Sequence, residues 1–231
     1  MKRFLPVLVF VLAGCVTLPV HLKYPSKAGN SVLGVAITLR APIAIFTDYP
    51  TAVYFAKIEK GETHLTAKRV VTANFVTRGR AYLVDCEPGE YVAVAAYTRK
   101  QAFKHQKDFS KPDMNPGEEQ FYCTYFGEKV IAVSRVSVGK NEFVFMGDIV
   151  VDLSILILNT EKVDMAIANY LGKVKFPDSP FLYLGDLKNI DRGPEAMTGL
   201  YRAAAKEFAE SGWSPLVNRR LMEPAGGQKA R

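Results

Sequence analysis

The chain has 231 residues and a formal net charge of +7, from 30 Lys and Arg against 23 Asp and Glu. Hydrophobic residues make up 48% of it, which excludes a disordered chain and is enough for one sizeable buried core. Nucleic-acid-binding proteins carry positive charge in a concentrated stripe, whereas here it is spread along the chain, so we expect no nucleic-acid partner.

Residues 1–14 have the three parts of an export signal. Lys2 and Arg3 supply positive charge, residues 4–12 are apolar, and an Ala-Gly pair supplies the small residues that precede a cleavage site. The apolar run is shorter than the roughly 20 residues that a membrane-spanning helix needs. We therefore predict a signal peptide over residues 1–14, whose removal lowers the formal charge from +7 to +5 because Lys2 and Arg3 are lost.

The letters LAGC at residues 12–15 resemble the lipobox of bacterial lipoproteins. The resemblance implies that Cys15 receives a diacylglyceryl group, becomes the first residue after cleavage, and anchors the protein to the cell envelope. Two or more acyl chains give stable attachment, whereas one gives only reversible binding. Val16 follows instead of Asp, which by resemblance to enterobacterial sorting implies the outer membrane, facing the periplasm. The alternative is a plain secretory signal with a chance Cys.

Residues 15–31 contain two prolines, a glycine and no hydrophobic period, so we predict a tether that lifts the domain off the membrane. From residue 32 to 158 the pattern alternates, as in LGVAITL, which places Leu33, Val35, Ile37 and Leu39 on one face. Seven or eight such segments, separated by short Gly-containing turns, predict a mainly β domain built as an antiparallel sandwich or barrel, of which we expect the β-sandwich.

The stretch CEPGEYVAVAAY at residues 86–97 resembles the strand-turn-strand hairpin of transthyretin-like and carboxypeptidase-regulatory-like sandwiches. VSVGKNEFVFMGDIVVD, at residues 136–152, is similar to their closing hairpin. The resemblance implies a domain that binds or scaffolds and brings no catalytic residues. Within the chain, FVFMGDI at 143–149 is echoed by FLYLGDL at 181–187, which predicts two equivalent strand ends that are paired neighbours.

Residues 159–223 change to a helical period and are predicted as a helical appendage packed on the sandwich. A first helix follows Asn159. A second begins at Gly193 and Pro194 and ends in a left-handed stop at Gly212, with an apolar face of Met197, Leu200, Tyr201, Ala204 and Phe208. Residues 224–231 are predicted to be disordered.

With Cys15 assigned to lipid, Cys86 and Cys123 remain. An oxidising compartment would allow them to form a disulfide, and two buried thiols are the alternative. His21, His64 and His105 are isolated, so we predict no metal site and no cofactor.

The serine and lysine of SVGK, residues 137–140, lie in a strand-turn-strand pattern and not at a helix start, and no other catalytic motif occurs. We therefore expect no enzyme.

A long loop after residue 97 is basic and carries aromatic side chains, which makes it our first candidate for a binding surface; a solvated loop without a partner is the alternative. Its residues are Arg99, Lys100, Phe103, Lys104, His105, Lys107, Phe109 and Lys111.

The sequence thus predicts a membrane-anchored, non-enzymatic binding or scaffold module whose partner is another envelope protein or polymer. One alternative is an envelope hydrolase or transferase that uses scattered acids, for which Asp85, Glu87, Asp148 and Asp186 are the candidates. Another is a carrier of a small hydrophobic ligand, which requires a large apolar cavity.

Overall fold

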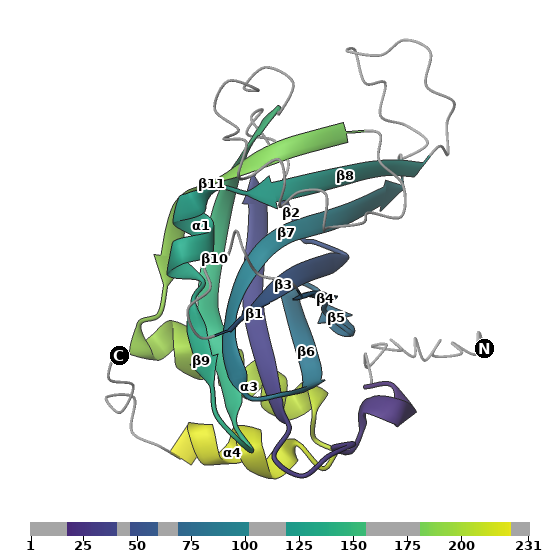
Figure 1. Ribbon diagram of the computed structural model, residues 1–231. Coiled ribbons are helices and arrows are strands. Elements are labelled where there is room, and N and C mark those ends of the chain that lie inside the picture. The colour runs from purple at the N-terminus through teal and green to yellow at the C-terminus, as the bar shows by residue number, and fades with distance from the viewer. Residues whose placement is uncertain (1–17, 41–46, 60–68, 102–118, 156–180, 223–231) are drawn as a thin grey trace, which may run out of the picture.

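The computed structural model describes residues 18–40, 47–59, 69–101, 119–155 and 181–222. Its centre is one mixed β-sheet of eleven strands that curls into a half-barrel, with helices at its margins (Figure 1). The strands are β1 (Ser31–Arg40), β2 (Thr47–Asp48), β3 (Ala52–Ile58), β4 (Arg69–Thr72), β5 (Phe75–Thr77), β6 (Arg80–Cys86), β7 (Gly89–Gln101), β8 (Glu119–Phe126), β9 (Val136–Val138), β10 (Phe143–Ile155) and β11 (Phe181–Asp191). The helices are the 3-10 helix η1 (Val20–Leu22) and the α-helices α1 (Glu128–Val133), α3 (Pro194–Glu207) and α4 (Ser214–Met222).

The strand order is β4-β3-β7-β8-β11-β10-β1-β6-β5, with β2 beside β1 and β9 beside β7. The β1–β10 and β8–β11 pairs are parallel, and the other pairs are antiparallel. The mainly β class is confirmed, but these strands form one curled mixed sheet and not the predicted antiparallel sandwich. Alternation reveals which face of a strand is apolar, and it does not reveal which distant strand lies beside it.

Two buried clusters hold the molecule together. The larger one, the inner core, takes in side chains of β1, β3, β6, β7, β8, β9, β10, β11 and α1. The four β1 residues that the alternating pattern placed on one face, Leu33, Val35, Ile37 and Leu39, all belong to it, as predicted.

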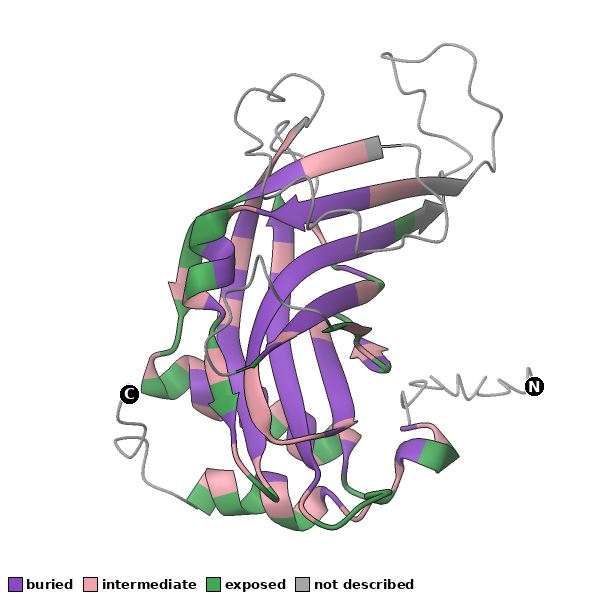
Figure 2. Ribbon diagram, viewed as in Figure 1, coloured by how far each residue is buried: buried purple, intermediate pink, exposed green. Residues whose placement is uncertain are grey.

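The smaller cluster, the basal core, lies on the opposite face of β1, β6 and β10 and is covered by α3, α4 and the segment before β1 (Figure 2). Its members are Leu18, Leu22, Val32, Ala36, Phe75, Tyr82, Val84, Phe143, Phe145, Met197, Leu200, Tyr201, Ala204, Phe208, Trp213 and Val217. The name refers to the lower end of the molecule in Figure 1, where α4 and η1 lie.

A bulge in β10 decides which residues reach each core. Gly147 has φ +123, a conformation that glycine adopts without strain, and the register against β1 shifts there. Val144 and Met146 before it and Ile149 and Val151 after it therefore all face the inner core.

The helices differ from the prediction in three respects. α3 begins at Pro194 and buries the predicted apolar face, but it ends at Glu207 and not at Gly212, and a further helix, α4, follows. Within residues 32–158, where the alternating pattern predicted strands, the structure also forms the helix α1, which the short strand β9 follows. The helix predicted after Asn159 and the tail 224–231 lie outside the described residues.

Strand β11 lies in the middle of the sheet, although residues 159–223 were predicted as a helical appendage. The internal echo correctly predicted that β10 and β11 are paired neighbours. Their Gly-Asp pairs are not strand ends, however, because Asp148 lies opposite Asp191 and Asp152 lies opposite Asp186 within both strands.

The predicted tether packs against the domain from Leu18 on. Leu18 and Leu22 are buried, with 5% and 7% of their surface exposed, because both side chains enter the basal core. The indole N–H of Trp213 donates a hydrogen bond to the Leu22 carbonyl (2.8 Å), and the Gly212 N–H donates to the Lys23 carbonyl (2.8 Å). Residues 18–30 are therefore part of the folded domain.

Candidate functional site

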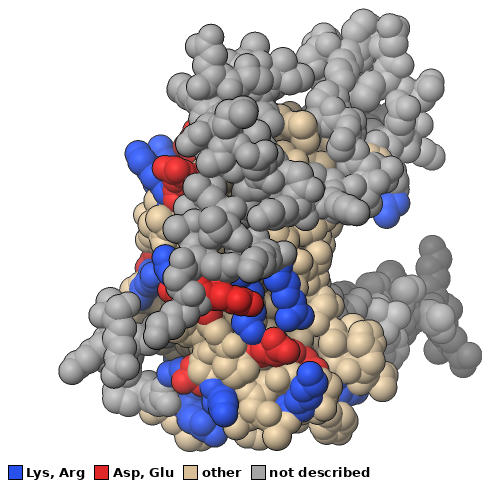
Figure 3. All heavy atoms as spheres, in the orientation of Figure 1, with Lys and Arg blue, Asp and Glu red and all other residues tan. Residues whose placement is uncertain are grey.

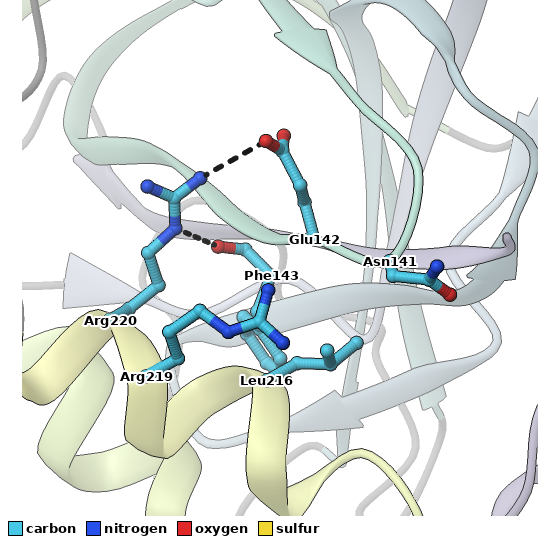
Figure 4. Close-up of a pocket in the computed structure, with 6 residues that line it drawn as sticks. All are labelled: Asn141, Glu142, Phe143, Leu216, Arg219 and Arg220. Carbon is cyan, nitrogen blue, oxygen red and sulfur yellow. Dashed lines mark hydrogen bonds and ion pairs between the residues drawn. The ribbon is translucent and has the colours of Figure 1, made fainter.

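A small polar pocket of about 70 Å³ opens between α4 and the turn that joins β9 to β10 (Figure 4). It is lined by Asn141, Glu142, Phe143, Leu216, Arg219 and Arg220. Ligand pockets for drug-sized molecules measure about 300–1,000 Å³, so this one is the size of a single small chemical group.

The β9–β10 turn that forms one wall is held by hydrogen bonds. The Ser31 hydroxyl donates to the Gly139 carbonyl (2.7 Å) and accepts from the Glu142 N–H (3.0 Å). The Glu142 carboxylate in turn accepts a bond from the Gly139 N–H (2.8 Å). Asn141 has φ 53, a left-handed conformation that Asn tolerates better than most residues. This wall is therefore rigid.

The other wall is α4, which the basal core fixes in place. Trp213, directly before the helix, and Val217, one turn on, are both fully buried. The Trp213 hydrogen bond to Leu22 sets the position of the helix start. Arg219 and Arg220 then project from α4 toward the β9–β10 turn (Figure 4).

The two arginines have different surroundings. Arg220 donates a hydrogen bond to the Phe143 carbonyl (3.3 Å), and its guanidinium lies 3.6 Å from the Glu142 carboxylate. Arg219 is exposed and makes no hydrogen bond or ion pair with any of the described residues. It is the cation in this pocket that is available to another molecule.

The pocket can bind an anionic group, and its lining offers no nucleophile. A guanidinium presents several N–H donors in a plane that matches phosphate and carboxylate. The one acid in the lining, Glu142, already accepts from the Gly139 N–H and pairs with Arg220. The arrangement therefore favours binding over covalent chemistry.

Sequence reasoning missed this site because it missed α4. The signal was present in SPLVNRRLM at residues 214–222, since a Ser-Pro pair is typical of a helix start. Trp213, Val217 and Leu221 recur at the four-residue spacing of one helix face, which leaves both arginines on the rest of the surface.

The predicted basic loop is described only at its beginning. Arg99 and Lys100 belong to β7 and pair with Phe121 and Gln120 of β8. Phe103, Lys104, His105, Lys107, Phe109 and Lys111 lie outside the described residues, so the loop stays a prediction.

Cys86 and Cys123 are both buried, and the structure does not join them in a disulfide. Cys86 ends β6 opposite Ser31, whereas Cys123 lies in β8 opposite Tyr97. Burial raises the pKa of Cys86 to about 12 and that of Cys123 to about 11. Both are therefore neutral thiols at physiological pH, which makes them poor nucleophiles.

Two of the acids considered for a hydrolase have structural partners. Asp85 has φ 66, and its carboxylate accepts bonds from the Ser26 N–H (3.0 Å) and the Asn30 amide (2.9 Å). Glu87 accepts a bond from Lys57 (2.9 Å), which lowers the pKa of this carboxyl group.

The other two acids lie farther along the sheet. The pKa of Asp148 is raised by burial and by Asp191, whereas Asp186 is exposed. The strand pairing places Asp85 beside the start of β1, and it places Asp186 level with the end of β1. At 3.3 Å per residue, these two positions are about 27–30 Å apart along the strand direction. The structure does not bring the four candidate acids into one site.

Among the described residues, no three His, Cys, Asp or Glu side chains come together in a group that could hold a metal ion. In those same parts of the chain, no helix has both the length and the apolar character that crossing a bilayer requires. The sequence matches no known protein-family model, and neither a characterised protein nor a solved structure shows significant similarity to it.

Proposed function

We propose that this chain is a lipoprotein of the bacterial cell envelope, anchored through Cys15, that acts as a non-enzymatic binding or scaffold module. Its anchor lies in the outer membrane, facing the periplasm, and its partner is another envelope protein or polymer.

The observation that carries this proposal is the LAGC box at residues 12–15 behind a positively charged, apolar leader. Among the described residues, the first member of the basal core is Leu18, so a cut before Cys15 removes none of its described members.

A role in binding is supported by the chemistry of the described side chains. The pocket at α4 presents cationic arginines and no nucleophile, and the two buried thiols are neutral.

Mass spectrometry of the N-terminal peptide from the membrane fraction tests the anchor. We expect a peptide that begins at Cys15 and carries acyl chains, and we expect Cys15→Ser to leave an uncleaved, unacylated precursor. A mature N-terminus without lipid would contradict the proposal.

Membrane choice and partner need two further measurements. Val16→Asp should move the protein from outer-membrane to inner-membrane fractions on a density gradient while acylation stays intact. In-cell crosslinking should capture a specific partner with wild type and lose it with Cys15→Ser. If wild type and Cys15→Ser captured the partner equally, partner binding would not depend on the membrane anchor.

A further inference from the structure

Three segments form one end of the molecule, which we call the basal face. They are residues 18–30, the β9–β10 turn at residues 139–142, and α4. The Asn141 N–H donates to the Gly29 carbonyl (3.2 Å), and the Gly212 N–H donates to the Lys23 carbonyl (2.8 Å), so residues 18–30 are bonded to the turn and to the residues directly before α4. α4 and η1 lie at the same end of the fold (Figure 1).

Large exposed hydrophobic side chains occur in two of these segments. Four large hydrophobic residues are prominently exposed in the described part of the chain, and three of them belong to the basal face: Val20 (81%), Tyr24 (68%) and Met222 (84%). Single exposed hydrophobic residues are ordinary, and these three become significant only together with the charges and the predicted anchor at the same end of the molecule.

The fold holds Tyr24 in its exposed position. A β-carbon on Gly212 would lie 2.9 Å from the Tyr24 ring and 3.5 Å from Pro25, so the ring packs against the glycine. The hydrogen bond between Gly212 and Lys23 fixes the adjacent backbone. Tyr24 is therefore a positioned side chain with an apolar ring and a polar tip, the type that is enriched where membrane meets water.

Positive charge surrounds these side chains. Residues 18–30 and α4 contain no Asp or Glu, and with the turn they carry Lys23, Lys27, Lys140, Arg219 and Arg220. The acids nearby are Glu142, which pairs with Arg220, and Glu210 of the α3–α4 turn, while the Asp85 carboxylate is bonded to Ser26 and Asn30. In the space-filling view, Lys and Arg side chains are scattered over the lower end among uncharged ones, and acidic side chains lie next to them (Figure 3).

The chain length places this face next to the anchor. Leu18 is buried in the basal core and follows Cys15 by three residues, which even fully extended span only about 10–11 Å. Val20 follows two residues later. A lipid on Cys15 would therefore hold the basal face at the bilayer surface, with no room for a long spacer.

From these observations we propose that the basal face lies directly on an anionic phospholipid surface, with Val20, Tyr24 and Met222 entering the headgroup layer and the cations contacting lipid phosphates. Its placement rests on the proposed Cys15 anchor. The exposed apolar side chains and the charges are properties of the fold itself.

The test uses the processed protein purified from membranes, with one added cysteine that carries the fluorophore NBD. Val20→Cys and Tyr24→Cys report on the basal face, and Glu128→Cys on exposed α1 is the matched control. Cys86 and Cys123 are buried and stay unlabelled. Each sample is mixed with vesicles of phosphatidylethanolamine and phosphatidylglycerol that contain a nitroxide-labelled lipid as quencher.

We expect strong quenching and a blue shift at positions 20 and 24 and little change at position 128. Quenching at 20 and 24 no greater than at 128 would overturn the proposal.

Flotation of the vesicles and the mass of the N-terminal peptide, measured on the same samples, report on the anchor separately. An acylated, floating protein without quenching at 20 and 24 would refute the basal contact and leave the anchor standing. Quenching without an acyl group would refute the anchor and leave the contact standing.

A charge variant tests the electrostatic part. Arg219→Gln should lower the quenching of the label at position 20 in vesicles with phosphatidylglycerol and leave it unchanged in neutral phosphatidylcholine vesicles. Lys129→Gln, which removes an exposed cation from α1, should change neither. Equal effects of the two variants would show that net charge alone, and not the basal face, draws the protein to lipid.

Discussion

The inner core and the basal core are built differently, although both are apolar. The inner core consists largely of Val, Ala, Ile and Leu side chains from strands that are neighbours in the sheet. Seven of the sixteen basal-core residues are aromatic, and its members come from segments that are far apart in sequence. Trp213 and Leu22, which share a hydrogen bond there, are 191 residues apart.

The hydroxyl groups of the two basal-core tyrosines are hydrogen-bonded. The Tyr82 hydroxyl donates to Glu207 (2.6 Å), and the Tyr201 hydroxyl donates to the Phe143 carbonyl (3.3 Å). Phe208 packs edge-on against both Tyr82 and Phe143, with ring centroids 5.1 Å apart in each case. Each such contact fixes an orientation as well as burying area.

This difference teaches that the sheet and the basal face depend on separate interactions. Loss of inner-core packing should weaken the sheet itself, whereas loss of a basal-core ring should first release α4 and residues 18–30. The following substitutions test that distinction in order of expected effect.

Trp213→Ala should give the largest loss of stability, about 3–5 kcal/mol, because it empties the site of a fully buried ring. It also removes the donor to the Leu22 carbonyl, so residues 18–23 should become sensitive to protease. Urea unfolding followed by circular dichroism measures the first effect. Trp213→Phe keeps an aromatic ring and should lower the free energy of unfolding by less than half as much. An equal loss in both variants would show that filling the site with a ring does not hold the basal face.

Gly34→Ala should lower the free energy of unfolding by about 1–3 kcal/mol, because an added β-carbon would lie 2.5 Å from the Phe145 ring of the basal core. Gly199→Ala is the matched control. Nothing lies within 4 Å of its added β-carbon, and alanine in the helix interior should stabilise α3 by about 0.5–1 kcal/mol. Thermal unfolding midpoints that move in the same direction would contradict this prediction.

Glu207→Gln should cost about 1–3 kcal/mol. The Glu207 carboxylate is largely buried and accepts two bonds from Arg80 (2.6 and 3.1 Å) as well as the Tyr82 bond, so it fastens α3 to β6. Glu210→Gln, at an exposed position, should change the free energy of unfolding by less than about 0.5 kcal/mol. Similar losses of unfolding free energy in both variants would mean that the ion pair between Arg80 and Glu207 makes no specific contribution to stability.

Alkaline pH should weaken the inner core through its thiols. The folded protein keeps Cys86 and Cys123 protonated, with pKa values of about 12 and about 11, whereas the unfolded chain loses these protons near pH 9. The unfolded state therefore binds fewer protons above pH 9, and stability falls as pH rises from there toward 11 and 12. Urea titrations across this range should show a smaller fall in Cys86→Ala than in wild type, and an unchanged fall would contradict the assignment.

Asp148→Asn should have the smallest effect, a gain of about 0.2–1 kcal/mol at neutral pH, because Asp148 faces Asp191 across the strand pair. Burial and this like charge raise the pKa of Asp148 in the folded state, so the ionised carboxylate lowers the free energy of unfolding at neutral pH. This destabilisation disappears as pH falls below the ordinary pKa of an aspartate, where the side chain is protonated in both states. The gain should therefore vanish in acid. A gain that persists at low pH would show that packing, and not charge, is responsible.

Alternating and helical patterns predicted much of the local structure correctly. The apolar face of β1 and the buried face of α3 follow from side-chain spacing alone, and the echo between β10 and β11 correctly predicted neighbouring strands. The candidate pocket was not predictable in this way, because it needs α4, the β9–β10 turn and their approach in space. Each of its residues is unremarkable within its own segment.

The sequence by itself determined that the protein is mainly β, which faces of β1 and α3 are apolar, and where α3 begins, because these depend on residues within a few positions of one another. Only the tertiary structure decided that the sheet is mixed, that β11 lies at its centre, and that residues 18–30 dock beside α4. Those outcomes depend on which distant apolar surfaces bury one another, a choice that local periodicity does not encode.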